Sequence, residues 1–303
     1  MSRIEKALEK AVKMRASVQE TATPEPLAAS VDAIPAGDVP CSVVHRYEMR
    51  EGAVDPAGVD RHVVCVTEPH SSATEQYKKL RATILRSTRS DNRTSFLVVS
   101  ADAGEGKSVT AINTAVALAN GIDHTVLLVD ADLRKPSVHR YLGLAPQAGL
   151  SDYLQGKVDI PDVLIHTGIG RLVFLPAGNP AENATELLSS QKMRTLLQEM
   201  KQRYGDRYII IDTSPILLTA DPLSLSNYAD GVLFVVRADH TSPKTVSRAL
   251  ALIKGSPIFG IIFNNVPKYL AKSHYPYYYR YGAAGYGYGE PSPGRKEDHA
   301  SPR

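Results

Sequence analysis

Apolar runs alternate along the chain with segments whose apolar residues recur at helical spacing. A short apolar run bounded by Gly or Pro is typical of a buried strand, whereas apolar residues three and four apart are typical of a helix. The predicted strands are 95–100, 125–130, 171–176, 207–212, 231–237 and 258–264. The predicted helices are 72–88, 107–120, 190–203, 222–227 and 243–254. This alternation predicts an α/β fold with a doubly wound, mostly parallel sheet that carries helices on both faces.

The N-terminal segment, residues 1–15, has its own pattern. Ile4, Leu8 and Ala11 fall on one face of a helix, which predicts an amphipathic docking helix. A helix this short is marginal alone. We therefore expect it to dock on the rest of this chain, on a partner or on a membrane surface.

The remaining segments follow from composition. Residues 16–70 are rich in Ala, Pro and Val without a period, which predicts a largely disordered linker with a short strand near 63–67. The alternating pattern makes 71–267 one domain. Residues 268–303 hold eight of the fifteen tyrosines among Gly and Pro, which predicts a flexible tail. The eight are Tyr269, Tyr275, Tyr277, Tyr278, Tyr279, Tyr281, Tyr286 and Tyr288.

Composition excludes several classes of protein. The net charge of +3 is too small to argue for nucleic acid as a partner. No run approaches the ~18 apolar residues of a membrane span, and the N-terminus lacks the apolar core of a signal peptide. Cys41 and Cys65 have no metal-type spacing. We therefore expect a cytoplasmic protein with no transmembrane span of its own.

The most specific motif is Ala-Asp-Ala-Gly-Glu-Gly-Lys-Ser at 101–108, between a predicted strand and a predicted helix. A phosphate-binding P-loop requires that context. Gly104 and Gly106 allow backbone turns that bring several N–H groups onto one phosphate. Lys107 would supply a cation to the phosphates, and Ser108 a hydroxyl to Mg²⁺. The motif therefore predicts a nucleotide site.

Three aspartates follow predicted strands. Asp130 and Asp132 come at the end of one strand, and Asp212 at the end of another. The carboxyl ends of parallel strands lie along one edge of a sheet, where ligands bind. Asp130 and Asp132 would face the same way along a strand. One carboxylate can then position Mg²⁺ while the other accepts a hydroxyl proton, which turns a nucleotide site into a phosphoryl-transfer site.

Together, the motifs at 101–108, 126–134 and 209–215 resemble the Walker A, A′ and B motifs of bacterial tyrosine kinases (BY-kinases). The apolar-Asp-x-Asp-x-Arg form of the middle motif is the most diagnostic, and the resemblance covers about 75–285. It implies a P-loop NTPase of the partition-ATPase-like type. It further implies a Mg-ATP-dependent protein-tyrosine autokinase that modifies its own tail, in trans, and regulates exopolysaccharide or capsule polymerisation and export.

The resemblance also implies roles for individual residues. Asp130 would be the base for the tyrosine hydroxyl, with Lys107 and Asp132 beside it. Ser108, Asp132 and Asp212 would hold Mg²⁺. The residues implied in nucleotide binding are Gly104, Glu105, Gly106, Lys107, Ser108, Val109 and Asn264. The residues implied in autophosphorylation are Tyr275, Tyr277, Tyr278, Tyr279, Tyr281, Tyr286 and Tyr288.

Partners are implied in the same way. A Glu-x-x-Arg-x-x-Arg helix mediates ring assembly in the family, and here it reads Glu75, Lys78 and Arg81. Lys78 replaces the first Arg of this pattern. The expected ring-like homo-oligomer therefore lacks the planar, bidentate pairing that an Arg guanidinium makes with a carboxylate. The absence of spans implies a separate membrane partner, a chain-length co-regulator. That partner would recruit the kinase to the inner face of the cell membrane.

Two other functions stay open. A partition-type ATPase would use water as the acceptor, although such proteins commonly have an extra Lys early in the loop, where Asp102 and Ala103 stand here. A nucleotide-switch adaptor would bind ATP without kinase activity. The tail would then serve adhesion or partner binding rather than act as a substrate.

Overall fold

The structure is a computed structural model, and it describes residues 50–51, 54–89, 93–203 and 206–267. The predicted docking helix, most of the predicted linker and the tyrosine-rich tail lie outside these residues. Within the described part, no helix is long and apolar enough to cross a membrane.

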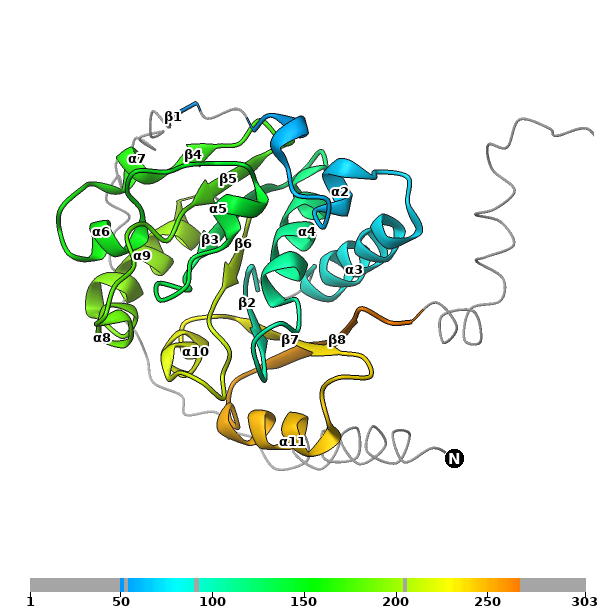
Figure 1. Cartoon of the computed structure of the whole chain (residues 1–303). Coiled ribbons are helices and arrows are strands. Elements are labelled where there is room, and N and C mark those ends of the chain that lie inside the picture. Colours follow the sequence, from blue (N-terminus) through cyan, green and yellow to red (C-terminus); the bar gives the residue numbers. More distant parts are fainter. Residues whose placement is uncertain (1–49, 52–53, 90–92, 204–205, 268–303) are drawn as a thin grey trace, which may run out of the picture. The chain divides into compact units, whose positions relative to one another are not determined.

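A single sheet forms the centre of the described fold (Figure 1). Its strands are β1 (Arg50–Glu51), β2 (Ser95–Ser100), β3 (Thr125–Asp130), β4 (Ile165–His166), β5 (Leu172–Leu175), β6 (Arg207–Asp212), β7 (Gly231–Arg237) and β8 (Ile258–Asn264). They lie in the order β1-β4-β5-β3-β6-β2-β7-β8. Neighbours are parallel except β4 and β5, which are antiparallel. The predicted α/β fold with a mostly parallel sheet is confirmed.

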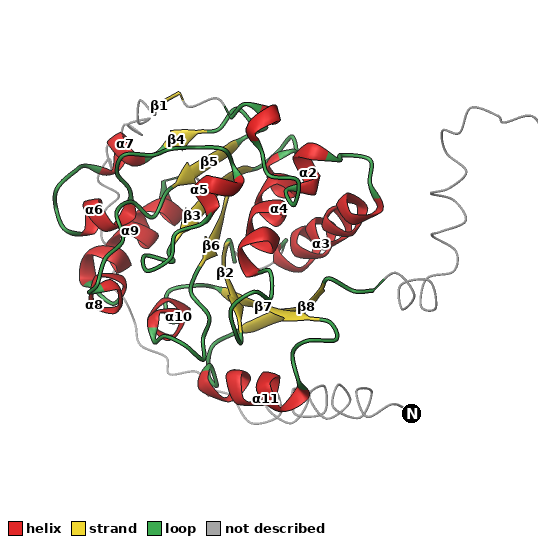
Figure 2. Ribbon diagram, in the orientation of Figure 1, coloured by secondary structure: helices red, strands yellow, loops and turns green. Residues whose placement is uncertain are grey.

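Helices cover both faces of the sheet (Figure 2). The helical elements are η1 (Pro56–Gly58), α2 (Val64–Thr67), α3 (Ser72–Thr88), α4 (Lys107–Ala119), α5 (Val138–Tyr141), α6 (Leu150–Leu154), α7 (Ile160–Val163), α8 (Ala184–Leu188), α9 (Gln191–Gln202), α10 (Asp221–Ser226) and α11 (Pro243–Leu252). Residues of α2–α5 bury their apolar side chains on one face, and residues of α6–α11 on the other.

Between their polar end residues, the central strands β2, β3 and β6 are continuously apolar because both of their faces are covered. Alternate residues of β2 enter different cores. Phe96 and Val98 pack with α3 and α4, while Leu97 and Val99 pack on the opposite side. All four side chains are fully buried. This arrangement is the reason such strands read as continuous apolar runs rather than as alternating ones.

The last strand of the sheet, β8, is less covered. It is the outermost strand beside β7, and Ile258, Ile261 and Phe263 are 40%, 47% and 55% exposed. Its final residue, Asn264, nevertheless reaches the phosphate loop. The end of β8 is therefore part of the site, although the strand lies at the edge of the fold.

The structure differs from the sequence prediction in the segment before α3. The short strand expected near 63–67 is wrong, because these residues form the helical turn α2. Val63 is fully buried, and Val54, Val59 and Cys65 are nearly so. The part of the predicted linker from 54 to 70 therefore packs against the domain.

Candidate functional site

The phosphate loop joins the buried strand β2 to the buried helix α4, as predicted. Gly104 and Gly106 have φ of +78° and +89°, in the left-handed region that only glycine adopts at no cost. Gly106 ends the loop, and α4 begins at Lys107. From Thr110 to Ala119 every α4 side chain is buried. The loop is thus fixed at one end by the sheet and at the other by a helix that cannot shift.

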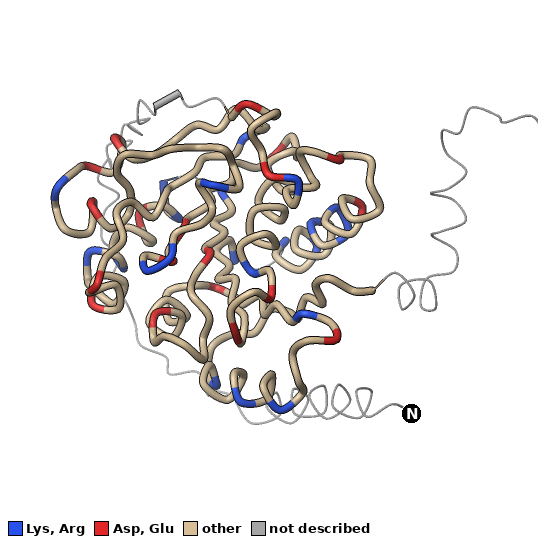
Figure 3. The backbone as a smooth tube through the Cα atoms, viewed as in Figure 1, with Lys and Arg blue, Asp and Glu red and all other residues tan. Residues whose placement is uncertain are grey.

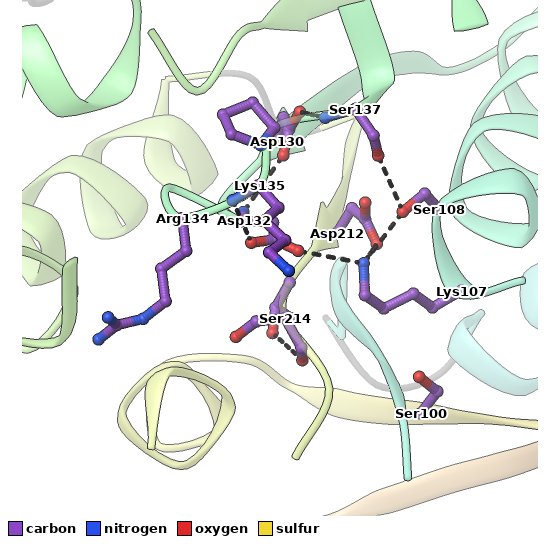
Figure 4. Close-up of polar contacts among 12 residues, drawn as sticks. Ser100, Lys107, Ser108, Asp130, Asp132, Arg134, Lys135, Ser137, Asp212 and Ser214 are labelled. Carbon is purple, nitrogen blue, oxygen red and sulfur yellow. Dashed lines mark hydrogen bonds and ion pairs between the residues drawn. The ribbon is translucent and has the colours of Figure 1, made fainter. Parts of the chain in front are cut away.

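Lys107 is the centre of the charged cluster (Figure 4). Its Nζ lies 3.4 Å from Asp132 Oδ2 and 3.6 Å from Asp212 Oδ1, and it donates to Ser108 Oγ at 3.0 Å. The side chain is only 12% exposed. Burial alone would lower the pKa of Lys107, but Asp212, Asp132 and Asp130 together raise it. The ammonium therefore stays charged, and it neutralises part of an acidic pocket.

Asp130 is held inside the protein by backbone groups. Its side chain is fully buried. Oδ1 accepts from the Asp132 N–H at 3.2 Å, and Oδ2 accepts from the N–H groups of Ser137 and Val138 at 3.1 Å each. Burial, and then the Asp212 carboxylate, raise the pKa of Asp130 to about 7. A carboxyl with that pKa exchanges a proton near neutral pH.

Asp132 does not share a strand face with Asp130. Strand β3 ends at Asp130, so Asp132 lies in the turn that follows. Its Oδ1 accepts from the Lys135 N–H at 3.0 Å, and its Oδ2 turns to Lys107. The assumption that both carboxylates face one way along a strand is therefore wrong. They meet at one centre because the turn folds back over the strand end.

Asp212 has the environment expected of a cation ligand. It ends β6 directly beside Asp130 in the sheet, and it is fully buried. Neither of its carboxyl oxygens accepts a hydrogen bond from the described residues. Burial raises its pKa, and the Lys107 ammonium opposes that effect. The Lys107 ammonium, 3.6 Å from Oδ1, is shared with Asp132, so the buried Asp212 oxygens keep the capacity to bind a cation.

Mg²⁺ fits this donor set. It usually takes one or two carboxylates and fills its remaining positions with water and substrate phosphates. Asp212 and the Ser108 hydroxyl supply such donors, with Asp132 beside them. Among the described residues no three acidic, His or Cys side chains converge as a ready-made cage. The residues present therefore suit Mg²⁺ whose coordination is completed by water and phosphate oxygens.

Two of the predicted nucleotide-binding residues, Glu105 and Asn264, hold the phosphate loop in place through hydrogen bonds. Glu105 is 1% exposed, and its carboxylate accepts from the Asp102 N–H at 2.9 Å and from the Thr241 hydroxyl. Asn264 Nδ2 donates to the Glu105 carbonyl at 2.9 Å. A Cβ at Gly106 would overlap that amide nitrogen. The end of β8 and the loop therefore fit together closely.

Sequence reasoning missed several polar residues that support the site. Asp221, fully buried at the start of α10, accepts from Arg134 Nε at 3.0 Å and from the Thr185 hydroxyl at 2.5 Å. Ser137 donates its N–H to Asp130, and its hydroxyl lies 3.3 Å from Ser108 Oγ. One signal was available for Asp221, since the pair Asp221-Pro222 opens the first helix after a strand that ends in an aspartate.

The structure brings together most of the predicted site. Lys107, Ser108, Asp130, Asp132 and Asp212 meet at the carboxyl ends of β3 and β6, beside the loop. Val109 is on α4 and is half-buried. The predicted acceptor tyrosines lie outside the described residues.

A glycine-rich loop between a parallel strand and a helix, with a buried lysine against strand-end aspartates, defines a P-loop nucleotide-binding protein. Residues 96–256 match the family model described as an AAA domain. The chain is 38% identical over 224 residues to tyrosine-protein kinase YwqD of Bacillus subtilis. The matched region covers 73% of this chain and 92% of that relative.

Two solved structures are similar to this chain in fold and sequence. The kinase domain of the Escherichia coli tyrosine kinase ETK is 29% identical, with a TM-score of 0.64 over 68% of this chain and 80% of that one. The chimerical protein CapA2B2 is also 29% identical, with a TM-score of 0.64 over 69% of this chain and 91% of that one. The chain belongs to the bacterial tyrosine kinase family within the P-loop NTPases.

Proposed function

We propose that this chain is a Mg-ATP-dependent protein-tyrosine autokinase whose acceptors are tyrosines of its own C-terminal tail. The observation that carries the proposal is the Lys107 ammonium, buried between Asp132 and Asp212 at the end of the phosphate loop. The curated relative YwqD is a tyrosine-protein kinase, which supports the class of reaction. The proposed acceptors are Tyr275, Tyr277, Tyr278, Tyr279, Tyr281, Tyr286 and Tyr288.

On the donor side, each residue has a role that its position supports. Lys107 would bind the β- and γ-phosphates, while backbone N–H groups of 104–108 hold them in place. Ser108 and Asp212 would hold Mg²⁺, with Asp132 helping to place it. When bound, Mg-ATP supplies the phosphoryl group and neutralises the charge that develops on it. Asn264, at the strand end beside the loop, is the proposed neighbour of the adenine.

On the acceptor side, Asp130 is the proposed base, taking the tyrosine proton on a carboxyl oxygen. Its pKa of about 7 suits proton transfer near neutral pH. Asp130 is covered by the N–H groups of Ser137 and Val138, so this role requires the turn 131–137 to open toward the hydroxyl. Geometry in a nucleotide-free site does not rule out such a base.

The acceptor segment starts close to the site. The chain leaves β8 at Asn264, which is hydrogen-bonded to the loop. From there to Tyr286 an extended chain spans on the order of 70 Å, at roughly 3.3 Å per residue. That reach includes a neighbouring copy. We propose phosphorylation in trans, within a homo-oligomer that a membrane chain-length co-regulator recruits and that regulates exopolysaccharide or capsule polymerisation and export.

Incubation with labelled ATP and Mg²⁺, followed by phosphoamino-acid analysis, tests this function. Phosphotyrosine should form, and Lys107→Met should abolish it. Lys244→Met, which removes an exposed lysine from α11, is the matched control and should keep the label. Phe at all eight tail tyrosines should remove most of it. Released phosphate without phosphotyrosine would instead support an ATPase, and binding without turnover an adaptor.

A mixing experiment separates trans from cis. Lys107→Met protein retains its tail tyrosines but lacks the proposed phosphate-binding cation. It is mixed with active protein whose eight tail tyrosines are Phe. Phosphotyrosine on the Lys107→Met chain can then arise only in trans. An unlabelled Lys107→Met chain, together with label on wild-type protein alone, would contradict the trans proposal.

A further inference from the structure

A basic groove lies beside the charged cluster and is not used by the proposed reaction. It has a volume of about 570 Å³. Its lining includes four basic side chains, Arg134, Lys135, His139 and Arg140, and three prolines, Pro136, Pro146 and Pro180. None of the described residues that line it is acidic. A groove with this lining is suited to an anion.

One basic side chain of the groove is held in place by its neighbours, and two others are exposed to solvent. Arg134 is oriented by Asp221 and Thr185, and Figure 4 shows it extending away from Lys107. Lys135 and Arg140 are exposed. Burial, and then Arg140, lower the pKa of His139, so its imidazole favours the neutral form and acts as a hydrogen-bond donor rather than as another charge. Lys135 and Arg140 are therefore the mobile cations that a ligand would meet first.

The prolines of the groove indicate which kind of anion it would bind. Pro146 and Pro180 present rigid apolar surface within the same groove as the cations. A small inorganic anion gains nothing from that surface, whereas an aromatic ring buries its faces against it. An aryl phosphate combines the two requirements, since its ring contacts the prolines while its phosphate pairs with Lys and Arg.

One segment joins the groove to the charged cluster. The N–H of Lys135 donates to Asp132, and the N–H of Ser137 donates to Asp130. The turn that lines one side of the groove therefore also holds two of the aspartates in place. A modified side chain that leaves the cluster needs to move only across this turn to reach the groove.

The tail changes sign when it is modified. Residues 268–303 contain six Lys and Arg but three Asp and Glu, so the unmodified tail is basic and is repelled by the groove. Each phosphate adds about −1.5 to −2 charges, so two or three make the tail acidic. We propose that the groove binds phosphotyrosine of a modified tail, that is, the product of the proposed reaction. The groove binds modified tails more tightly than unmodified ones.

Binding of a synthetic peptide tests the groove without any catalysis. The probe is residues 275–281 with a fluorophore and a phosphate on Tyr279, and the protein is the full chain carrying Lys107→Met, without nucleotide. The phosphopeptide should bind at least about tenfold more tightly than the unmodified peptide. The double substitution Lys135→Gln and Arg140→Gln should remove that difference. Lys244→Gln and Arg248→Gln, two exposed cations of α11, are the matched control and should retain it.

Further probes distinguish the ligand class. A peptide with phosphoserine in place of phosphotyrosine should bind more weakly, as should inorganic phosphate used as a competitor. Equal binding of both phosphopeptides would overturn the phosphotyrosine assignment, and equal binding by the groove variant and the control would overturn the site. The peptide is synthetic and the protein carries Lys107→Met, so a failure of the kinase proposal would leave this result unaffected.

Discussion

At the scale of single residues, the buried Asp130 carboxyl links the stability of the nucleotide-free protein to pH. Burial, aided by Asp212, raises its pKa to about 7, above the ~3.9 of an aspartate in an unfolded chain. The folded protein thus keeps a proton that the unfolded chain has released. The stabilisation is fully present below about pH 4 and is lost as the pH rises through about 7.

We predict that the free energy of unfolding falls between pH 4.5 and 7, by up to ~1.4 kcal/mol per pH unit from this group. Denaturant unfolding of the nucleotide-free protein at several pH values measures the slope. Asp130→Asn has no proton to exchange, so its slope should be smaller by that amount. Parallel curves for the two proteins would show that Asp130 ionises normally.

The two loop glycines give a second prediction at this scale. Both have positive φ, so Ala at either costs about 1–2 kcal/mol of backbone strain. At Gly104 a Cβ would meet nothing within 4 Å, whereas at Gly106 it would overlap the Asn264 amide. Gly106→Ala should therefore destabilise the protein more than Gly104→Ala, as measured by thermal unfolding.

A double-mutant cycle checks the cause of that difference. Asn264→Ala removes the amide that the new Cβ would overlap. The pair Gly106→Ala and Asn264→Ala should then be more stable than the sum of the single changes predicts, by about 0.5–3 kcal/mol. Additive changes would mean that the loop moves away from β8 without cost.

At the scale of elements, Asn113 of α4 attaches the segment before α3 to the domain. Its Oδ1 accepts from the Cys65 N–H, and its Nδ2 donates to the His62 carbonyl, each at 2.9 Å. Asn113→Ala leaves both backbone groups without this partner and should cost about 1–3 kcal/mol. Hydrogen exchange across 54–70 should rise at the same time.

The next residue of the same helix provides a control. Thr114 is also buried on α4, but its hydroxyl has no hydrogen-bond partner among the described residues. Thr114→Val keeps the shape and removes that hydroxyl, so it should be neutral or slightly stabilising. If Thr114→Val lowers stability as much as Asn113→Ala, any change of a buried polar residue on α4 is destabilising, and the hydrogen bonds of Asn113 are not the cause.

The same segment shows what the sequence could not predict. The long elements follow from local pattern, because β2, β3 and β6 each have a continuous apolar run between polar end residues and α3 repeats at helical spacing. Residues 63–67 are rich in valine and favour a strand by composition. They form a helical turn whose backbone is bound by Thr74, ten residues on, and by Asn113, 48 residues from Cys65. A contact of that kind leaves no local signal.

The site was predictable to a similar extent. Lys107, Ser108 and the strand-end aspartates follow from motif and topology, since parallel strands end at one edge of the sheet. The orientation of Asp132 does not, because the turn 131–137 folds back and gives each carboxylate different partners. Asp221 was missed for the same reason: its partner Arg134 lies 87 positions away.

At the scale of the whole molecule, α3 presents the surface on which assembly is expected to depend. Figure 3 shows lysine and arginine positions repeating along this helix. Lys78 Nζ lies 2.6 Å from Glu75 of the same helix, and both side chains are nearly half exposed. An exposed pair of this kind contributes little to stability and leaves a point charge where the family has a planar guanidinium.

Lys78→Arg should therefore strengthen self-association. We expect the association constant to rise by about tenfold, because a guanidinium can pair with a carboxylate through two hydrogen bonds. Sedimentation over a range of concentrations measures the change, with Lys78→Gln as the control that removes the charge. A variant that sediments like the wild-type protein would exclude this position from the interface.

The contact between Asn264 and the Glu105 carbonyl has a mechanical consequence. It joins the phosphate loop to a strand that lies 159 positions further along the chain, and the tail begins only a few residues beyond that strand. A pull on the chain beyond β8 acts on Asn264, whose carbonyl accepts from the Ala238 N–H at 2.9 Å and whose side chain donates to Glu105, so the load is shared between the sheet edge and this hydrogen bond. Tension on the tail is thus transmitted to the loop that holds the nucleotide.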